Sequence, residues 1–255
     1  MTRMLALQKG IIYGPVNSRR LGSSLGINLL PTGFKACPFN CAYCQYGYTP
    51  EKGYRTEWNG DDIPSVDMVI EALVAALDEY PAVSYITFSG NGEPTLHPQF
   101  GAIVEEVGKT KKQYAPQAKL AILSNSGLVK RADIREALMR LDVRFMKLDA
   151  GEHETFMKFN RPHNSITFSE VVEGLKMLGD FSIQALFAAG EHGNYQESHI
   201  ESWARLIDEL KPNECHLYSL DRPTPDGKLT KVDKDGLSYL VSIARKFTDI
   251  PIKIF

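Results

Sequence analysis

The sequence predicts an α/β fold, a partial (β/α)6 barrel in which six strands alternate with six helices. Two patterns support this prediction. Short apolar runs rich in β-branched residues recur along the chain, and each is followed by the apolar spacing of an amphipathic helix. Such alternation gives a parallel sheet with helical crossovers. Because six units are two fewer than a closed eight-fold barrel contains, we expect an open, TIM-like partial barrel.

The expected elements follow the chain in strict alternation. The expected strands are residues 26–30, 84–88, 120–123, 143–148, 182–187 and 215–220. The expected helices are residues 65–79, 98–109, 132–141, 168–178, 197–210 and 235–245. In the first helix Ser65 has the residue type of an N-cap, and the residues that share its apolar face are Val66, Ile70, Leu73 and Leu77. We expect one domain over residues 1–255, with an N-terminal extension (1–25), a barrel core (26–246) and a C-terminal edge segment (247–255).

The composition favours a folded protein that does not enter the membrane. Of the 255 residues, 43% are apolar and 24% are charged, which is enough for a sizeable core. The formal net charge of −2 gives no electrostatic reason to favour a nucleic acid as partner, although a local basic patch stays open. No apolar stretch approaches the length that crosses a bilayer, and the N-terminus lacks the pattern of a secretory signal. We therefore expect a cytoplasmic protein.

Three of the four cysteines, Cys37, Cys41 and Cys44, fall within eight residues in the spacing C-x3-C-x2-C. Soft thiolates clustered in this way select an iron–sulfur cluster or zinc. Tight clustering in a chain of this size argues against disulfides. A structural zinc site would need a fourth protein ligand, from Cys215 or a histidine. Cys215 opens an expected strand, where a packed core thiol is the common role.

Polar and glycine-rich residues follow the ends of the expected strands. The cysteines follow the first strand, and Ser89-Gly90-Asn91-Gly92-Glu93 follows the second. Ser124-Asn125-Ser126 follows the third strand, and Asp149 follows the fourth. In parallel α/β folds the carboxyl ends of the strands share one face, and the loops there carry function. We expect these segments to converge on a single site.

The cysteine spacing, with the aromatic Tyr43 before the last cysteine, resembles the signature of the radical S-adenosylmethionine (SAM) superfamily. Residues 89–94 are similar to that family's second signature, a Gly-Gly-Glu-like turn after the second strand. The resemblance implies a [4Fe-4S] cluster on the three cysteines, with SAM bound at the open iron. It also implies cleavage of SAM to a 5′-deoxyadenosyl radical that abstracts hydrogen from a substrate. An electron donor of the flavodoxin or ferredoxin type is implied as partner.

The resemblance further implies which residues bind SAM. Glu93 would accept from the ammonium of the methionine part, and the ring of Tyr43 would stack on adenine. Ser124 and Asn125 lie where the family contacts the ribose and carboxylate, unless they only cap the loop after the strand. The predicted SAM-binding residues are Tyr43, Gly90, Asn91, Gly92, Glu93, Ser124 and Asn125. Leu186 and Phe187 either flank adenine or pack in the core.

Charged residues near the strand ends are candidates for catalysis and substrate binding. Lys147 and Asp149 are two positions apart on a strand, so they point to the same face. They form either a structural ion pair or an active-site pair, in which Lys147 would anchor substrate, donate a proton or act as a Schiff-base nucleophile. The guanidinium groups of Arg161 and Arg222 suit a substrate carboxylate or phosphate, or a neighbouring loop. Arg19, beside Arg20 in a stretch rich in Gly and Ser, binds an anionic group or braces the cysteines.

The Gly- and Ser-rich stretch around Arg19 and Arg20 resembles a radical SAM subgroup related to the wyosine-base synthases, which modify a tRNA guanosine. The segments Leu148-Asp149-Ala150 and Asn160-Arg161-Pro162 are similar to the same subgroup. Those synthases bind a second cluster through three more cysteines before the main motif, and residues 1–36 contain none. We therefore do not carry over the wyosine activity. The alternatives that stay open are an activating enzyme for a glycyl residue on a partner protein, a tRNA-base-modifying enzyme and a non-enzymatic iron–sulfur electron carrier.

Overall fold

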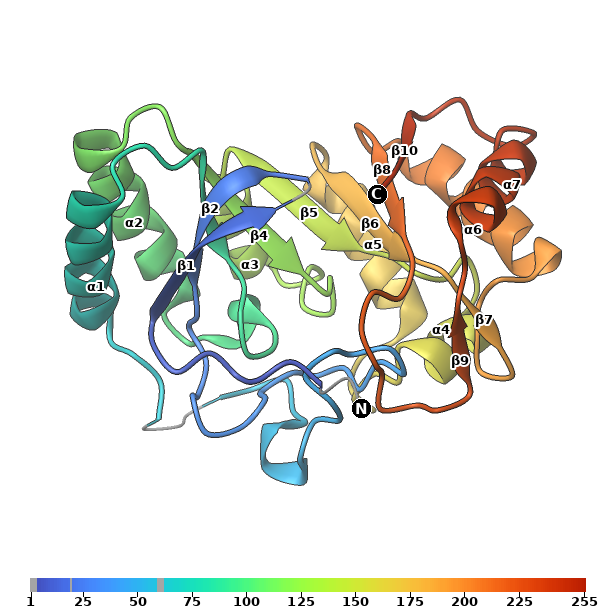
Figure 1. The fold of residues 1–255 in the computed structure, drawn as a ribbon, viewed down its shortest axis with the longest axis horizontal. Helices are drawn as coiled ribbons and strands as arrows, with labels where there is room; N and C mark the ends of the chain where they lie inside the picture. Colours follow the sequence, from blue (N-terminus) through green and yellow to red (C-terminus); the bar gives the residue numbers. More distant parts are fainter. Residues whose placement is uncertain (1–3, 19, 59–61) are drawn as a thin grey trace.

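Eight strands form one sheet in the part of the chain that the computed structural model describes, residues 4–18, 20–58 and 62–255 (Figure 1). The strands neighbour one another in the order β1 (Ile12–Ser18), β2 (Gly22–Ile27), β3 (Tyr85–Phe88), β4 (Lys119–Ser124), β5 (Val143–Lys147), β6 (Ser182–Leu186), β8 (Cys215–Tyr218) and β10 (Ile252–Ile254). Every neighbouring pair from β2 to β10 is parallel. The predicted α/β fold of the partial-barrel type is confirmed.

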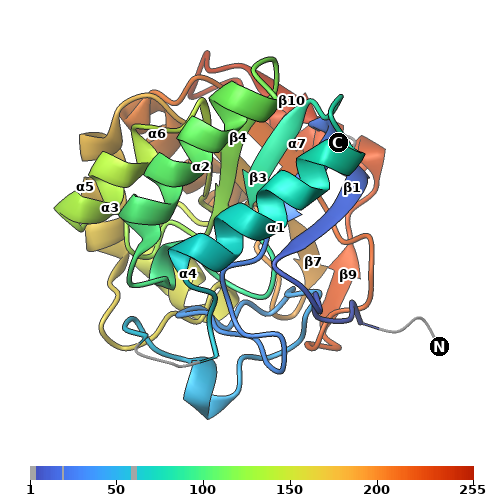
Figure 2. The same ribbon diagram turned by 90° about the vertical axis from the view of Figure 1, so that its left-hand side faces the viewer.

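Helices connect the parallel strands and lie side by side along one side of the sheet (Figure 2). Their bounds are α1 (Val66–Glu79), α2 (Phe100–Tyr114), α3 (Ala132–Leu138), α4 (His153–Phe159), α5 (Phe168–Leu178), α6 (Glu197–Leu210) and α7 (Lys234–Ala244). The Ser65 side chain caps α1 by accepting from the backbone of Met68, as its residue type predicts. The face of α1 that is fully buried consists of Val69, Leu73 and Leu77.

The beginning of the sheet differs from the expectation. The strand expected at residues 26–30 ends at Ile27, and the next residue, Asn28, still donates its backbone N–H to the Ile11 carbonyl at 2.7 Å while its Nδ2 donates to the Leu30 carbonyl at 2.9 Å. Strand β1 was not expected at all. It pairs antiparallel with β2 at the edge of the sheet, where Pro15 is tolerated because one side of the strand needs no ladder hydrogen bond.

Other unexpected elements are short. Helix α4 has seven residues, too few for an apolar period to stand out. Strands β7 (Ala188–Gly190) and β9 (Leu229–Lys231) form a separate antiparallel pair just beyond the carboxyl end of β6. At the C-terminal edge, β10 pairs in parallel with β8.

The buried apolar side chains form one hydrophobic cluster that runs between the helices and the sheet. Its largest members include Trp203, Phe88, Phe100 and Phe181. Phe39, from the segment that carries the cysteines, is buried in the same cluster, so this segment is part of the folded core. Within the described ranges, no helix is long and apolar enough to cross a membrane.

Candidate functional site

The loop of residues 36–47, here the cysteine loop, is fixed at its start and near its middle by backbone hydrogen bonds. Ala36 N donates to the Asn91 carbonyl at 2.9 Å, and Ala42 N donates to the Phe159 carbonyl at 2.9 Å. The loop therefore joins the carboxyl end of β3 to the end of α4. Cys37 and Cys41 are buried and Cys44 is half-buried. In Figure 1 this part of the chain runs below the sheet, on the same side as α4 and β9.

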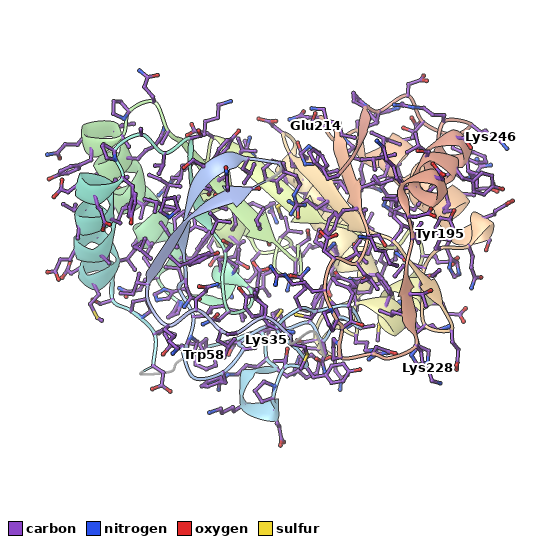
Figure 3. All side chains as sticks on the ribbon, in the orientation of Figure 1. Lys35, Trp58, Tyr195, Glu214, Lys228 and Lys246 are labelled. Atoms are coloured by element: carbon purple, nitrogen blue, oxygen red, sulfur yellow. The ribbon has the colours of Figure 1, made fainter. Side chains whose placement is uncertain are left out.

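Donor groups of the protein surround the three sulfur atoms. Asn125 Nδ2 donates to Cys37 Sγ at 3.4 Å, and Asn160 Nδ2 lies 3.7 Å from Cys41 Sγ. Lys35, only 4% exposed, donates to the Gly47 carbonyl at 3.1 Å, and its positive charge interacts with all three cysteines. Figure 3 labels Lys35 below the sheet, in the region of the cysteine loop. These contacts make the loop a site for an electron-rich sulfur-bound group.

Burial raises the pKa of the Cys37 thiol to about 12 and that of Cys41 to about 11, although the positive charge of Lys35 opposes both shifts. The free thiols are therefore protonated, and a metal centre would displace these protons. Among the described residues, no group of three or more His, Cys, Asp or Glu side chains is arranged around a single metal ion. The cysteines of a four-iron cluster each bind a different iron atom and do not converge on one point.

The turn of residues 89–94, here the glycine turn, lies directly against the cysteine loop. Gly92 forms a parallel bridge with Ala36, and a Cβ on Gly92 would lie 1.7 Å from the Ala36 carbonyl oxygen. A Cβ on Gly90 would lie 2.6 Å from Asn28 Oδ1. Both positions need glycine because the protein's own backbone and Asn28 occupy the space. The Asn91 side chain is bonded to Gln8 and to the Pro31 carbonyl.

Glu93, 1% exposed, accepts four hydrogen bonds from the protein. Oε1 accepts from Thr95 N and Oγ1 at 3.2 and 2.7 Å and from Ser124 Oγ at 2.9 Å, while Oε2 accepts from Asn125 N at 2.6 Å. Burial raises the pKa of the Glu93 carboxyl, and these donors oppose the shift. Oε1 accepts three of these bonds and Oε2 only one, so Oε2 is the oxygen with room for a further donor. Ser124 and Asn125 thus support Glu93 and Cys37 directly.

Asp149 also accepts four hydrogen bonds and is 2% exposed. Oδ2 accepts from the hydroxyl of Tyr43 at 2.5 Å and from Asn160 Nδ2 at 2.7 Å. Oδ1 accepts from Leu186 N at 2.7 Å and pairs with Lys147 Nζ at 2.8 Å. Burial raises the pKa of the Tyr43 phenol well above its usual value, and the negative charge of Asp149 adds to the shift. Asp149 therefore connects the cysteine loop to β5, α4 and β6.

Lys147 has a second partner in Tyr218, whose hydroxyl accepts from Nζ at 2.8 Å. Burial lowers the pKa of Lys147, but the charge of Asp149 and the hydrogen bonds outweigh it, so the net shift is upward. The guanidinium carbon of Arg20 lies 4.7 Å from the centre of the Tyr218 ring, and its NH1 is buried without a hydrogen-bond partner. Two cations thus lie against one tyrosine.

The other predicted residues fall in different places. Arg161 is committed to the protein: it pairs with Asp226 at 2.6 Å and donates to the Tyr48 hydroxyl at 3.1 Å. Arg222 is exposed near Tyr46. Cys215 is buried in β8, away from the other cysteines in the sequence, and burial strongly raises the pKa of its thiol. The predicted role of Arg19 falls outside the described residues.

Asp226 gives this end of the barrel a pH-dependent contact. Besides Arg161, its Oδ2 accepts from His192 Nδ1 at 2.7 Å, and these bonds outweigh burial and lower the pKa of Asp226 to about 2. Because the folded-state pKa lies below the unfolded value, the stabilisation is present at neutral pH and is lost as pH falls from about 4 towards 2. We expect Asp226→Asn to lose about 2 kcal/mol of unfolding free energy at pH 7, and about half of that at pH 3. Urea titrations of the wild-type and variant proteins at several pH values measure this difference in unfolding free energy. A difference that did not change with pH would contradict the lowered pKa of Asp226.

Two residues that sequence reasoning did not assign are part of this site. Lys35 lies two positions before Cys37, and only its burial reveals a role. Asn160 is 119 positions from Cys41 and 11 from Asp149, yet bonds to both. Its Oδ1 is buried without a partner, so the site still offers an unused acceptor. The Asn160-Arg161-Pro162 motif was the only signal for Asn160, and it did not reveal the contact.

Comparison with known proteins agrees with the site described above. The profile of the Radical SAM superfamily matches residues 33–207, which include the cysteine loop, the glycine turn and Asp149. The UPF0026 protein MJ1312 of Methanocaldococcus jannaschii is 31% identical over 247 residues, covering 94% of this chain and 72% of that protein. The resemblance stated from the motifs is thereby confirmed.

Solved structures show the same fold at low sequence identity. A radical SAM methyltransferase from Sphaerobacter thermophilus superposes with a TM-score of 0.68 at 14% identity, over 91% of this chain and 66% of that chain. The structure of TYW1 with a lysine-pyruvate adduct bound superposes with a TM-score of 0.61 at 14% identity, over 88% of this chain and 73% of that chain.

Proposed function

Because the chain belongs to the radical SAM superfamily, whose enzymes use a [4Fe-4S] cluster and SAM, we propose that Cys37, Cys41 and Cys44 bind this cluster. The observation that carries the proposal is the cysteine loop itself. Its three thiols lie on a backbone-anchored segment, amide donors lie beside two of the sulfurs, and the buried Lys35 cation interacts with all three cysteines. Three ligands leave one iron without a protein ligand.

The glycine turn supports a SAM site next to this iron. The turn is bonded to the cysteine loop through Ala36 and Gly92, so anything bound at the turn is adjacent to the cysteines. Glu93 Oε2 keeps one free acceptor site for an ammonium, and Asn160 Oδ1 is a second free acceptor. The side chains of Asn91 and Ser124 are used inside the protein, so we assign their contribution to holding the turn.

When bound, the cluster and SAM supply a 5′-deoxyadenosyl radical that removes a hydrogen atom from a substrate. The protein's residues position the reactants and exclude water. Tyr43, held by Asp149 and packed on Phe159 with ring centres 4.9 Å apart, forms a rigid wall beside Cys44. We propose that this wall supports the nucleoside part of SAM.

We place the substrate next to Lys147 and Arg20. The buried NH1 of Arg20 has no partner, and among the described residues no carboxylate forms an ion pair with Arg20. A buried guanidinium nitrogen without a hydrogen-bond partner favours an anionic acceptor, so we propose a substrate with a carboxylate or phosphate group. TYW1 has been solved with a lysine-pyruvate adduct. Here the ion pair with Asp149 keeps Lys147 an ammonium, so we assign it as a charged anchor and not as an amine nucleophile.

Anaerobic reconstitution tests the proposal. Enzymes of this superfamily need a reductant, for which dithionite substitutes in vitro and a flavodoxin or ferredoxin is our proposed natural donor. The protein loaded with iron and sulfide and supplied with SAM should release 5′-deoxyadenosine, measured by chromatography. Compounds with a carboxylate or phosphate should raise this rate, and neutral analogues should not. Iron–sulfur absorbance with no SAM cleavage would instead favour an electron carrier. Stimulation only by a partner protein would favour an activating enzyme, and stimulation only by tRNA would favour a tRNA-base-modifying enzyme.

A further inference from the structure

We propose that three buried groups beside the cysteines, the ammonium of Lys35 and the side-chain amides of Asn125 and Asn160, together raise the reduction potential of the bound cluster. The amide of Asn125 donates to Cys37, that of Asn160 lies against Cys41, and the charge of the buried Lys35 acts on all three cysteines. The inference rests on the proposed function, because it needs a cluster on these cysteines. It concerns how easily the site takes up an electron.

Lys35 is the strongest member because its charge has no other counterpart. It is 4% exposed, and among the described residues no carboxylate forms an ion pair with it. An ammonium has three N–H donors, of which one goes to the Gly47 carbonyl at 3.1 Å, and the charge of Lys35 interacts with all three cysteines. A buried cation needs an anion nearby. The cysteine thiolates of a bound cluster are the anions that this position provides.

Asn125 is held in place to donate to sulfur. Its backbone N–H donates to Glu93 Oε2 at 2.6 Å, and its Oδ1 accepts from Gly127 N at 2.7 Å. These two bonds fix the amide plane, which leaves Nδ2 directed at Cys37 Sγ, 3.4 Å away. Besides its backbone contact with the cysteine loop, the glycine turn is therefore linked to the cluster site by hydrogen bonds from Asn125 to Glu93 and from Asn125 to Cys37.

Asn160 is the weaker third donor. Its Nδ2 donates to Asp149 Oδ2 at 2.7 Å, and the remaining hydrogen is shared between Cys41 Sγ at 3.7 Å and the Tyr43 hydroxyl at 3.4 Å. Its contact with Cys41 is longer than that of Asn125 with Cys37. We therefore expect the effect on the potential to decrease from Lys35 to Asn125 to Asn160.

The physical reason is charge. Reduction adds an electron to a sulfur-rich centre that already carries negative thiolates. Donors and a nearby cation stabilise the reduced form more than the oxidised form, so they raise the potential. Burial strengthens the effect because water does not screen these contacts. Removing the Lys35 charge should therefore make the cluster harder to reduce.

A redox titration of the reconstituted protein, followed by the electron paramagnetic resonance signal of the reduced cluster and run without SAM, tests this inference. We expect Lys35→Met to shift the equilibrium between reduced and oxidised cluster at least tenfold towards the oxidised form, about 59 mV for one electron. Lys35→Gln keeps a donor without the charge and should show a smaller shift. Asn125→Ala should shift the potential in the same direction.

Lys52→Met is the matched control. Lys52 is an exposed lysine close to the same loop and lies over the Phe34 ring, with Nζ 3.7 Å from its centre. Its removal should leave the potential unchanged, because water screens its charge. Variants that assemble the cluster with the wild-type potential would overturn the inference, and so would equal shifts in Lys35→Met and Lys52→Met. A wild-type protein that binds no cluster would overturn the proposed function itself.

Discussion

Cys41→Ala should lose the iron–sulfur cluster. Reconstituted wild-type protein is expected to hold about four iron atoms per chain with broad visible absorbance, and the variant almost none of either. The reason is geometric: Cys41 lies in the middle of the loop, between the bonds of Ala36 to Asn91 and of Ala42 to Phe159. With one thiolate missing, two irons of the cluster lack a protein ligand. Production of 5′-deoxyadenosine should fall to background.

Cys215→Ala separates this loss from a general effect of removing a buried thiol. Cys215, 0% exposed, and Cys41, 9% exposed, both belong to the buried core cluster, but Cys215 lies in β8 and not in the cysteine loop. Its replacement should cost some stability and leave iron content unchanged. Iron analysis and visible spectra of the three proteins, reconstituted in parallel, measure the difference. Full iron content in Cys41→Ala would refute the assignment of the cysteine loop.

The barrel was predictable because short strand segments alternate regularly with the apolar spacing of amphipathic helices. Residues 143–147 and 182–186 are buried along most of their length, although each segment also contains polar residues. Strand β1 could not be predicted in the same way: it is exposed along much of its length and contains Gly14 and Pro15, which ordinarily indicate a turn. Its position in the sheet depends on pairing with β2, which occurs only in the folded protein.

The site was predictable where its residues are neighbours in the sequence. The cysteines and the glycine turn are short motifs, whereas the partners of Glu93 and Asp149 come from several elements. Asn125 is 88 positions from Cys37, and a lone asparagine after a strand carries no sign of its sulfur contact. Lys35 was missed for a different reason. A lysine in a sequence is presumed to be exposed, and only tertiary packing places one among three thiols.

Asp149→Ala should be among the most destabilising single substitutions in this protein. The substitution leaves the Lys147 ammonium buried without its carboxylate and removes the acceptor of Tyr43, Asn160 and Leu186 N. Breaking a buried ion pair from one side costs about 3–5 kcal/mol. We expect a loss of this size in the free energy of unfolding, measured by urea titration of the apoprotein under anaerobic, reducing conditions. Lys147→Met should cost less, because Asp149 keeps three neutral donors.

The double variant decides whether this pair is a structural unit. With both charges removed, no unpaired charge stays buried, so the combined loss should be smaller than the sum of the single losses by about 1–3 kcal/mol. Glu105 and Lys109 form a matched surface pair 3.0 Å apart, 51% and 60% exposed, whose coupling should stay below about 0.5 kcal/mol. Additive losses at Asp149 and Lys147 would show that the two residues are not energetically coupled. Lys147 would then be free to leave Asp149 for a substrate at little cost, and its assignment as a fixed, charged anchor would have to be given up.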